Sequence, residues 1–234
     1  MQSLNLSRTF DAPPGTLVFA PLAWLKLQWF CHQGDTEIGG FGITAEKNPL
    51  YVEQFVTVGQ TVTPMTVRFD NKAVADFFDA CVDKGMRPER FARIWLHTHP
   101  GSSADPSGTD EKTFASSFGR CDWAVMFILS RAARTYARLA FSAGPGAAVL
   151  IPVAVDWAAL PEDLARAGGI DAQIAQWRAD YDAHVQPAPL ALHLPSLVAG
   201  EALTDRWDGL PWTEDWDGFF YEPANPKDPN ERLI

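Results

Sequence analysis

The feature that most constrains this chain is a largely apolar run that ends in two histidines. Phe91 to Leu96 leads directly into His97-Thr98-His99-Pro100. A short apolar run of this kind predicts a buried central strand. Because side chains alternate along a strand, two histidines at positions i and i+2 project from the same face, so both imidazoles can reach one ion.

A second polar group follows a short loop. Ser107-Gly-Thr-Asp110 opens a predicted helix, with Ser107 at the N-cap and Asp110 three residues on, close to the spacing of a capping box. A structural zinc site has four protein ligands, whereas a catalytic site has three and leaves the fourth position to water. Asp110 is the natural third ligand, because the loop 100–106 would bring it back beneath the histidines.

A simpler explanation exists for each half of this pattern. The two histidines could be satisfied polar residues at a strand end, and the serine and aspartate could form only a helix cap. For the histidine pair alone, that explanation would be preferred. The complete string, with all four residues at these spacings, favours a metal site formed by His97, His99 and Asp110.

The rest of the chain alternates between helical and strand-like patterns. We predict helices within 13–35, over 73–84, from 107 and over 161–185, and strands over 37–44, 91–96, 123–129, 136–141 and 148–155, with two more within 51–70. This order predicts an α/β or α+β sandwich with a central mixed sheet flanked by helices. We assign residues 1–185 to one domain and 186–234 to an aromatic, acidic C-terminal extension that either packs on the domain or binds a partner.

Charge and cysteine content exclude several kinds of protein. The formal net charge of −10 argues against a nucleic-acid-binding surface. It is compatible with a basic protein partner, but solubility alone is the preferred explanation. Three widely spaced cysteines suggest neither a disulfide framework nor a thiolate metal site, and no long apolar segment predicts a membrane span. We therefore expect a cytoplasmic protein without a membrane or nucleic-acid partner.

The string HTHPGSSADPSGTD resembles the signature of the JAMM (MPN-plus) zinc metalloproteases. In that family, His-[Ser/Thr]-His-Pro is followed by Ser-x-x-Asp and preceded by an upstream glutamate. Glu37 lies just before a glycine-bearing run, where the family places its glutamate, whereas Glu46 and Glu53 do not. The order of predicted elements also follows the family over roughly 15–155, which implies an MPN-like fold.

The resemblance implies a role for each residue of the motif. His97, His99 and Asp110 would bind Zn²⁺, with water as the fourth ligand, and Glu37 would act as general base. Ser107 would stabilise the oxyanion of the tetrahedral intermediate, or it would serve only as a helix cap, and the two roles are compatible.

The resemblance also implies a class of substrate. The expected reaction is hydrolysis of an amide or isopeptide bond after the C-terminal glycines of a ubiquitin or ubiquitin-like protein, with the modifier's activating and conjugating enzymes as further partners. A prokaryotic member would deconjugate such a modifier, trim its precursor or process a sulfur-carrier protein. The alternative is a non-catalytic MPN-type scaffold. A narrow groove along the glycines at 39–42 would suit a Gly-Gly tail.

Overall fold

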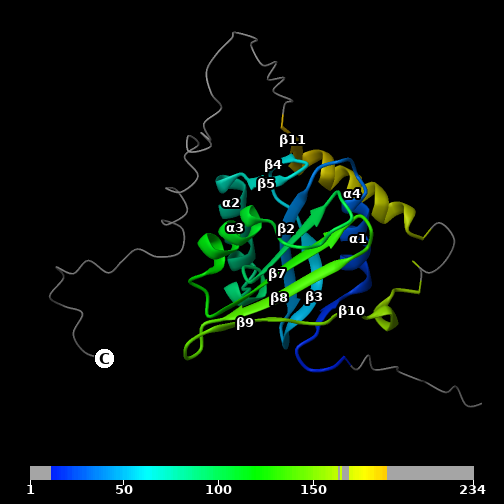
Figure 1. Cartoon of the computed structure of the whole chain (residues 1–234). Helices are drawn as coiled ribbons and strands as arrows, with labels where there is room; N and C mark the ends of the chain where they lie inside the picture. Colours follow the sequence, from blue (N-terminus) through cyan, green and yellow to red (C-terminus); the bar gives the residue numbers. More distant parts are fainter. Residues whose placement is uncertain (1–11, 163, 165–168, 189–234) are drawn as a thin grey trace, which may run out of the picture. The chain divides into compact units, whose positions relative to one another are not determined.

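A computed structural model describes residues 12–162, 164 and 169–188 (Figure 1). This part of the chain is a mixed α/β structure with four α-helices and a large curled mixed sheet of eight strands in the order β10-β1-β3-β2-β6-β7-β8-β9. The strands of this sheet are β1 (Leu17–Phe19), β2 (Ile38–Ala45), β3 (Asn48–Val56), β6 (Ile94–His99), β7 (Trp123–Ser130), β8 (Thr135–Phe141), β9 (Ala147–Leu150) and β10 (Val153–Val155).

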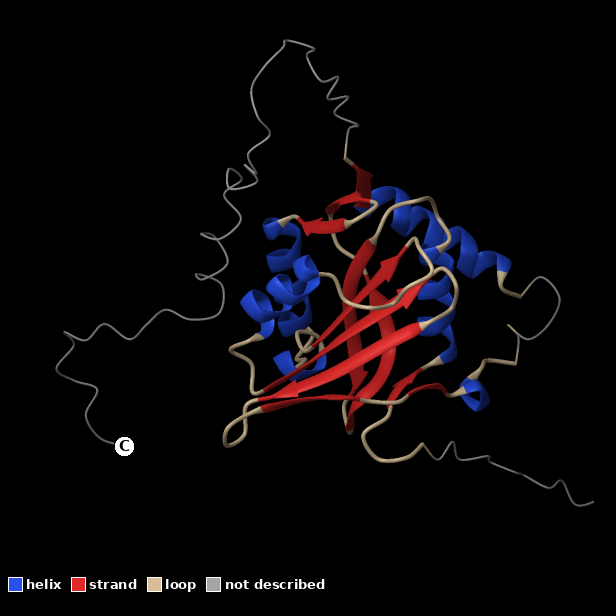
Figure 2. Cartoon of the chain, in the orientation of Figure 1, coloured by secondary structure: helices blue, strands red, loops and turns tan. Residues whose placement is uncertain are grey.

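A smaller sheet of three strands, in the order β11-β4-β5, contacts β2 through β5. It consists of β4 (Gln60–Thr63), β5 (Thr66–Phe69) and β11 (Val185–Pro187). The helices are α1 (Pro21–Cys31), α2 (Asn71–Asp83), α3 (Gly108–Phe118) and α4 (Asp171–His184), and two short 3₁₀ turns occur at Pro88–Arg90 and Trp157–Ala159. Figure 2 shows α2 and α3 on one side of the large sheet and α1 and α4 on the other.

Local signals in the sequence account for four of the helix ends. Pro21 begins α1, where its missing N–H is not needed, and Asp70 caps α2 by accepting a hydrogen bond of 2.9 Å from the backbone N–H of Ala73. Gly85, with φ of +73°, follows α2 in a conformation that side chains disfavour. Ser107 caps α3 through a complete capping box.

The main core lies between α1, α4 and the large sheet. Its fully buried side chains include Leu27 and Phe30 of α1 and Phe127 of β7. Trp177 of α4 belongs to the same cluster, and Ile174 and Tyr181 of that helix pack against it. A second cluster under α2 contains Ile43, Cys81, Phe91 and Ala92.

The strand that carries the two histidines lies near the middle of the large sheet, as predicted. β6 pairs with β2 on one side, antiparallel, and with β7 on the other, parallel. The antiparallel register sets Ile38 opposite Thr98 and Gly39 opposite His97. The backbone N–H of Ile38 also donates a 3.1 Å hydrogen bond to the Thr98 hydroxyl. This register brings the start of β2 to the histidine end of β6.

Three predicted elements differ from the structure. Residues 51–70 contain three strands, because the chain turns between β4 and β5. The predicted strand 148–155 is two strands, β9 and β10, that belong to different edges of the sheet. The last helix begins at Asp171 and not at 161. In the first two cases a proline, Pro64 or Pro152, interrupts the ladder because it lacks an N–H.

The glycines of β2 do not leave a groove for a substrate tail. A Cβ at Gly39 would come within 2.7 Å of the Phe69 ring and 2.9 Å of a Val67 methyl, both from β5. A Cβ at Gly40 would meet the Val56 carbonyl and the Phe55 ring. The space that these glycines leave is therefore filled by the chain itself, and the suggestion of a groove along 39–42 was wrong.

Two further expectations concern the rest of the chain. None of the helices within the described residues is long and apolar enough to cross a membrane. The predicted C-terminal extension was 186–234, but its first residues, Gln186 and Pro187, belong to β11, which pairs with β4. The rest of the extension, from residue 189 onward, lies outside the described residues.

Candidate metal centre

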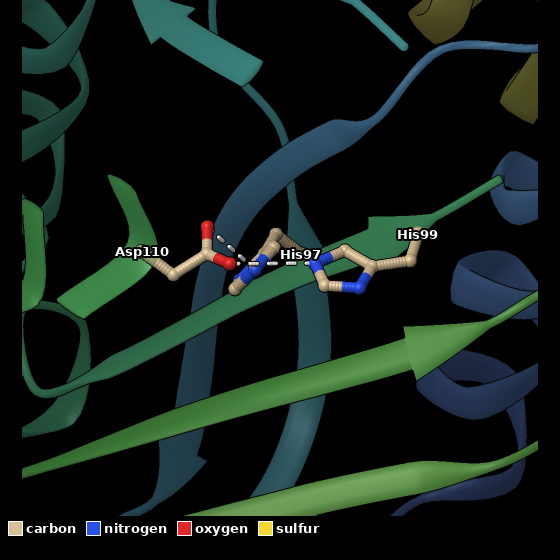
Figure 3. Close-up of side chains that lie close together, drawn as sticks. All are labelled: His97, His99 and Asp110. Carbon is tan, nitrogen blue, oxygen red and sulfur yellow. Dashed lines mark ion pairs between the residues drawn. The ribbon is translucent and has the colours of Figure 1, made fainter. Parts of the chain in front are cut away.

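The structure brings the three predicted metal ligands together. Ligand atoms of His97, His99 and Asp110 lie within 4.8 Å of one another. Asp110 Oδ1 lies 3.2 Å from His97 Nε2, and Asp110 Oδ2 lies 3.5 Å from His99 Nε2. Figure 3 shows the Asp110 carboxylate directed at both imidazoles, with the histidines on β6 and the aspartate on α3. These three residues could hold a metal ion.

The helix cap orients the carboxylate. The backbone N–H of Ser107 donates a 2.7 Å hydrogen bond to Asp110 Oδ2, and the backbone N–H of Asp110 donates to Ser107 Oγ at 3.1 Å. Asp110 is buried, and its position in the first turn of α3 is favourable for a negative charge. The capping box that the sequence predicts therefore also directs Asp110 towards the histidines.

The histidine nitrogens fit a metal ion because they are buried and unpaired. Within the described chain, His97 Nδ1, His97 Nε2 and His99 Nε2 have no hydrogen-bond partner. Leaving a buried polar atom unpaired is costly, so such atoms call for an explanation. Two imidazoles and one carboxylate form a donor set that suits first-row divalent metals and leaves a coordination position open.

The proton on His99 can be assigned from its neighbour. His99 Nδ1 lies 3.2 Å from the backbone carbonyl oxygen of Ser103. Because a carbonyl only accepts, Nδ1 carries the proton and Nε2 keeps its lone pair. A hydrogen bond of this kind from the second ring nitrogen commonly fixes a metal-binding histidine. The Ser103 hydroxyl in turn donates to Asp105 Oδ2 at 2.7 Å, which fixes the loop.

Charges in the metal-free site favour the ligand forms of two residues. Burial lowers the pKa of His97, so its imidazole is neutral near pH 7. Burial acts to raise the pKa of Asp110, but the adjacent His97 and His99 imidazoles outweigh it and hold that pKa well below its ordinary value. Burial acts to lower the pKa of His99, whereas Asp110 and Glu37 raise it above its ordinary value. A divalent cation would compete with that proton.

Glu37 lies beside the three ligands. It immediately precedes β2, and the register that pairs Ile38 with Thr98 sets Glu37 next to His99. Its backbone N–H donates a 2.9 Å hydrogen bond to the carbonyl of Thr63, and its Oε1 lies 3.7 Å from His99 Nε2. Burial raises the pKa of Glu37 to about 8, an effect that His99 opposes and Asp110 reinforces. A buried carboxyl group with a shifted pKa is typical of functional sites.

The remaining serine, glutamate and histidine side chains with possible roles in a site lie in different settings. Ser107 is exposed, and its hydroxyl accepts the hydrogen bond that caps α3. Glu53 pairs with Arg90 at 3.2 Å, and Glu46 is exposed. His184 pairs with Asp180 at 2.8 Å on α4. His193 lies outside the described residues.

Two neighbours of the ligands were not found from the sequence. Trp95 stacks on His97 with 4.2 Å between ring centroids, and Ser103 accepts the proton of His99 through its backbone. Trp95 stands two residues before His97, so strand alternation already puts both on one face. The role of Ser103 had no signal, because a backbone carbonyl is present in every residue.

Comparisons with known proteins add no assignment. No model of a known family matches the sequence, and no curated protein matches it either. The case for a function therefore depends on the residues themselves.

Proposed function

We propose that this protein is a zinc-dependent metalloprotease of the JAMM type with an MPN-like fold. The observation that carries the proposal is the convergence of His97, His99 and Asp110 on one point, with the Glu37 carboxylate beside them. Three protein ligands with an open position are typical of catalytic zinc sites, whereas structural sites have four. The two imidazoles and one carboxylate also suit zinc better than calcium or magnesium, which prefer oxygen ligands.

The chemistry divides between the ion and the chain. A zinc ion at this site would make a water molecule acidic near neutral pH and polarise the carbonyl of the scissile bond. A bound divalent cation would favour the carboxylate form of Glu37 despite the raised pKa of the metal-free site. In that form Glu37 would accept a proton from the attacking water on a carboxylate oxygen and return it to the leaving amine. It is free for this role because it lies outside the three-residue set.

Ser107 has a separate part in the proposal. Its oxygen accepts the backbone N–H of Asp110, which leaves its own O–H available as a donor. That proton would stabilise the negative oxygen that develops during hydrolysis, a contribution of about 3 kcal/mol for a single donor in other hydrolases. Capping and oxyanion stabilisation therefore use different parts of one hydroxyl group.

The substrate class is supported by the resemblance of the motif. We propose cleavage of the peptide or isopeptide bond after the C-terminal glycines of a ubiquitin-like protein, either from a target or from its own precursor, including a sulfur-carrier protein, in the cytoplasm. The activating and conjugating enzymes of that modifier would be the associated partners. The negative charge of the chain is compatible with a basic partner.

The test combines metal content with hydrolysis. The purified protein should bind one zinc ion and release aminocoumarin from C-terminal aminocoumarin amides of ubiquitin and of a Gly-Gly peptide. Glu37→Gln keeps the size of the side chain and removes its basicity, so zinc content should persist while cleavage falls to background. Cleavage by Glu37→Gln would disprove the role of general base. Zinc binding without hydrolysis of any ubiquitin-like fusion would favour the scaffold alternative.

A further inference from the structure

Trp95 is placed to orient one metal ligand without a hydrogen bond. Its indole stacks on the His97 imidazole with 4.2 Å between centroids and 20° between planes. Both rings are buried, and His97 is fully inaccessible to solvent. His97 Nε2 faces Asp110 Oδ1 at 3.2 Å, and neither nitrogen of His97 has a hydrogen-bond partner in the described chain. The stack is therefore a second specific contact, and it acts on the plane of the ring.

The same indole also contacts the helix that carries the third ligand. Trp95 stacks on Phe118, in the last turn of α3, with 6.4 Å between centroids and 19° between planes. Phe118 stacks in turn on Phe114 of the same helix, at 5.4 Å and 24°. One aromatic column therefore runs from β6 into α3. It joins the strand of His97 to the helix of Asp110.

The far end of the column is held by a charged pair. Arg138 of β8 lies over the Phe114 ring, 5.4 Å from its centroid. Its two terminal nitrogens donate hydrogen bonds of 2.7 Å to the two carboxylate oxygens of Glu111. Glu111 follows Asp110 in the first turn of α3, so this bidentate pair fixes that turn against the sheet.

We infer that Trp95 is a positioning residue of the metal centre, which aligns His97 by stacking and couples it to Asp110 through α3. Metal-binding histidines usually have an outer partner for their second nitrogen, and His97 has the face of an indole in place of that partner. The buried indole N–H has no partner among the described residues, so the ring face, and not the N–H, is the part of Trp95 that contacts the site. This inference rests on the metal site of the proposed function but not on its protease activity.

The first test measures zinc affinity by competition with a chelator. Trp95→Phe keeps an aromatic face and should keep most of the wild-type affinity. Trp95→Leu keeps a smaller apolar side chain without a ring, and zinc affinity should fall by roughly 10- to 100-fold, the range for loss of an outer partner. The control is Phe91→Leu, which removes a ring from the separate cluster under α2. It should lower the stability of the protein without lowering its affinity for zinc.

A second readout separates positioning from general destabilisation. Co²⁺ bound in place of zinc reports ligand geometry through its visible spectrum. Trp95→Leu should change that spectrum, whereas Trp95→Phe and Phe91→Leu should retain the wild-type bands. Wild-type affinity and an unchanged spectrum in Trp95→Leu would overturn the inference, as would an equal loss of affinity in Phe91→Leu.

The outcome for the proposed function is distinguishable. A wild-type protein that binds no zinc contradicts the metal site itself, and with it this inference. A wild-type protein that binds zinc but cleaves no substrate contradicts only the protease, and the comparison of the Trp95 variants proceeds unchanged.

Discussion

His97 and His99 lie two residues apart on one strand, yet they are held in different ways. His97 is fully buried, stacks on Trp95 and has no hydrogen-bond partner in the described chain. The side chain of His99 is 12% exposed, and it donates from Nδ1 to the carbonyl of Ser103 in the loop before α3. One ligand is therefore positioned by the core and the other by a surface loop.

This difference indicates which changes each ligand tolerates. Interiors are close-packed, so a change in volume near His97 must move neighbouring side chains or backbone. A loop at the surface relaxes at small cost, but it also orders its own groups less firmly. Substitutions near His97 should therefore affect both stability and metal binding, whereas substitutions near His99 should affect mainly metal binding.

The largest expected effect comes from removing either ligand. His97→Ala and His99→Ala should each weaken zinc binding by more than about 100-fold, the upper limit for an outer partner. In the wild type, a chelator should lower the melting temperature, because zinc binds only the folded state. In both variants the chelator should change the melting temperature little. Scanning calorimetry with and without zinc measures this. Retained stabilisation by zinc in either variant would contradict the ligand assignment.

The same two variants sharpen the comparison when zinc is absent. His97→Ala opens a cavity beside Trp95, whereas His99→Ala truncates a side chain at the edge of the core. Urea denaturation of the metal-free proteins should therefore show a loss of at least about 1 kcal/mol for His97→Ala and a smaller loss for His99→Ala. Equal losses would contradict the division into a core-held and a loop-held ligand.

Packing opposite His97 provides the next contrast. Gly39 lies opposite His97 in the sheet, and a Cβ there would come within 2.7 Å of the Phe69 ring. Gly39→Ala should lower the free energy of unfolding by about 1–3 kcal/mol, as overpacking does. The matched change near His99 is Ser103→Ala, which leaves the backbone carbonyl in place. Its free energy of unfolding should stay within about 0.5 kcal/mol of the wild-type value. Urea denaturation of both variants measures the difference.

The smallest expected effect concerns the loop that holds His99. Asp105 accepts a hydrogen bond from the Ser103 hydroxyl at 2.7 Å, and its backbone N–H donates to the same oxygen at 3.0 Å. Asp105→Ala should loosen the Ser103 carbonyl that accepts the hydrogen bond from His99. Zinc affinity should fall by less than about 10-fold, a smaller loss than in Trp95→Leu. Chelator competition on both variants ranks them. A larger loss in Asp105→Ala would show that the loop matters more than the stack.

Much of the candidate site could be predicted because its causes are local. Strand alternation puts His97 and His99 on one face, and the cap at Ser107 orients Asp110, which depends on residues within one turn. The first helix lies within the predicted range 13–35 and begins at Pro21, a residue suited to the first position of a helix. Such features depend on neighbours in the chain, which the sequence shows directly.

The predictions that were wrong, and the features that were missed, depend on residues distant in sequence. The glycines of β2 accommodate Phe69, Val67 and Phe55 of other strands, so their role could not be read from the run itself. The split between β9 and β10 depends on which edge of the sheet each strand joins. The start of α4 at Asp171 was also misjudged, because an apolar pattern alone does not mark where a helix begins.

The sequence by itself determined which atoms could bind a metal, because residue type, strand alternation and a helix cap are local properties. Only the tertiary structure decided that Glu37 lies 3.7 Å from His99, since that proximity comes from the pairing of β2 with β6. It also decided how each histidine is held, because a stacked indole and a loop carbonyl become partners only when β6, α3 and the connecting loop pack together.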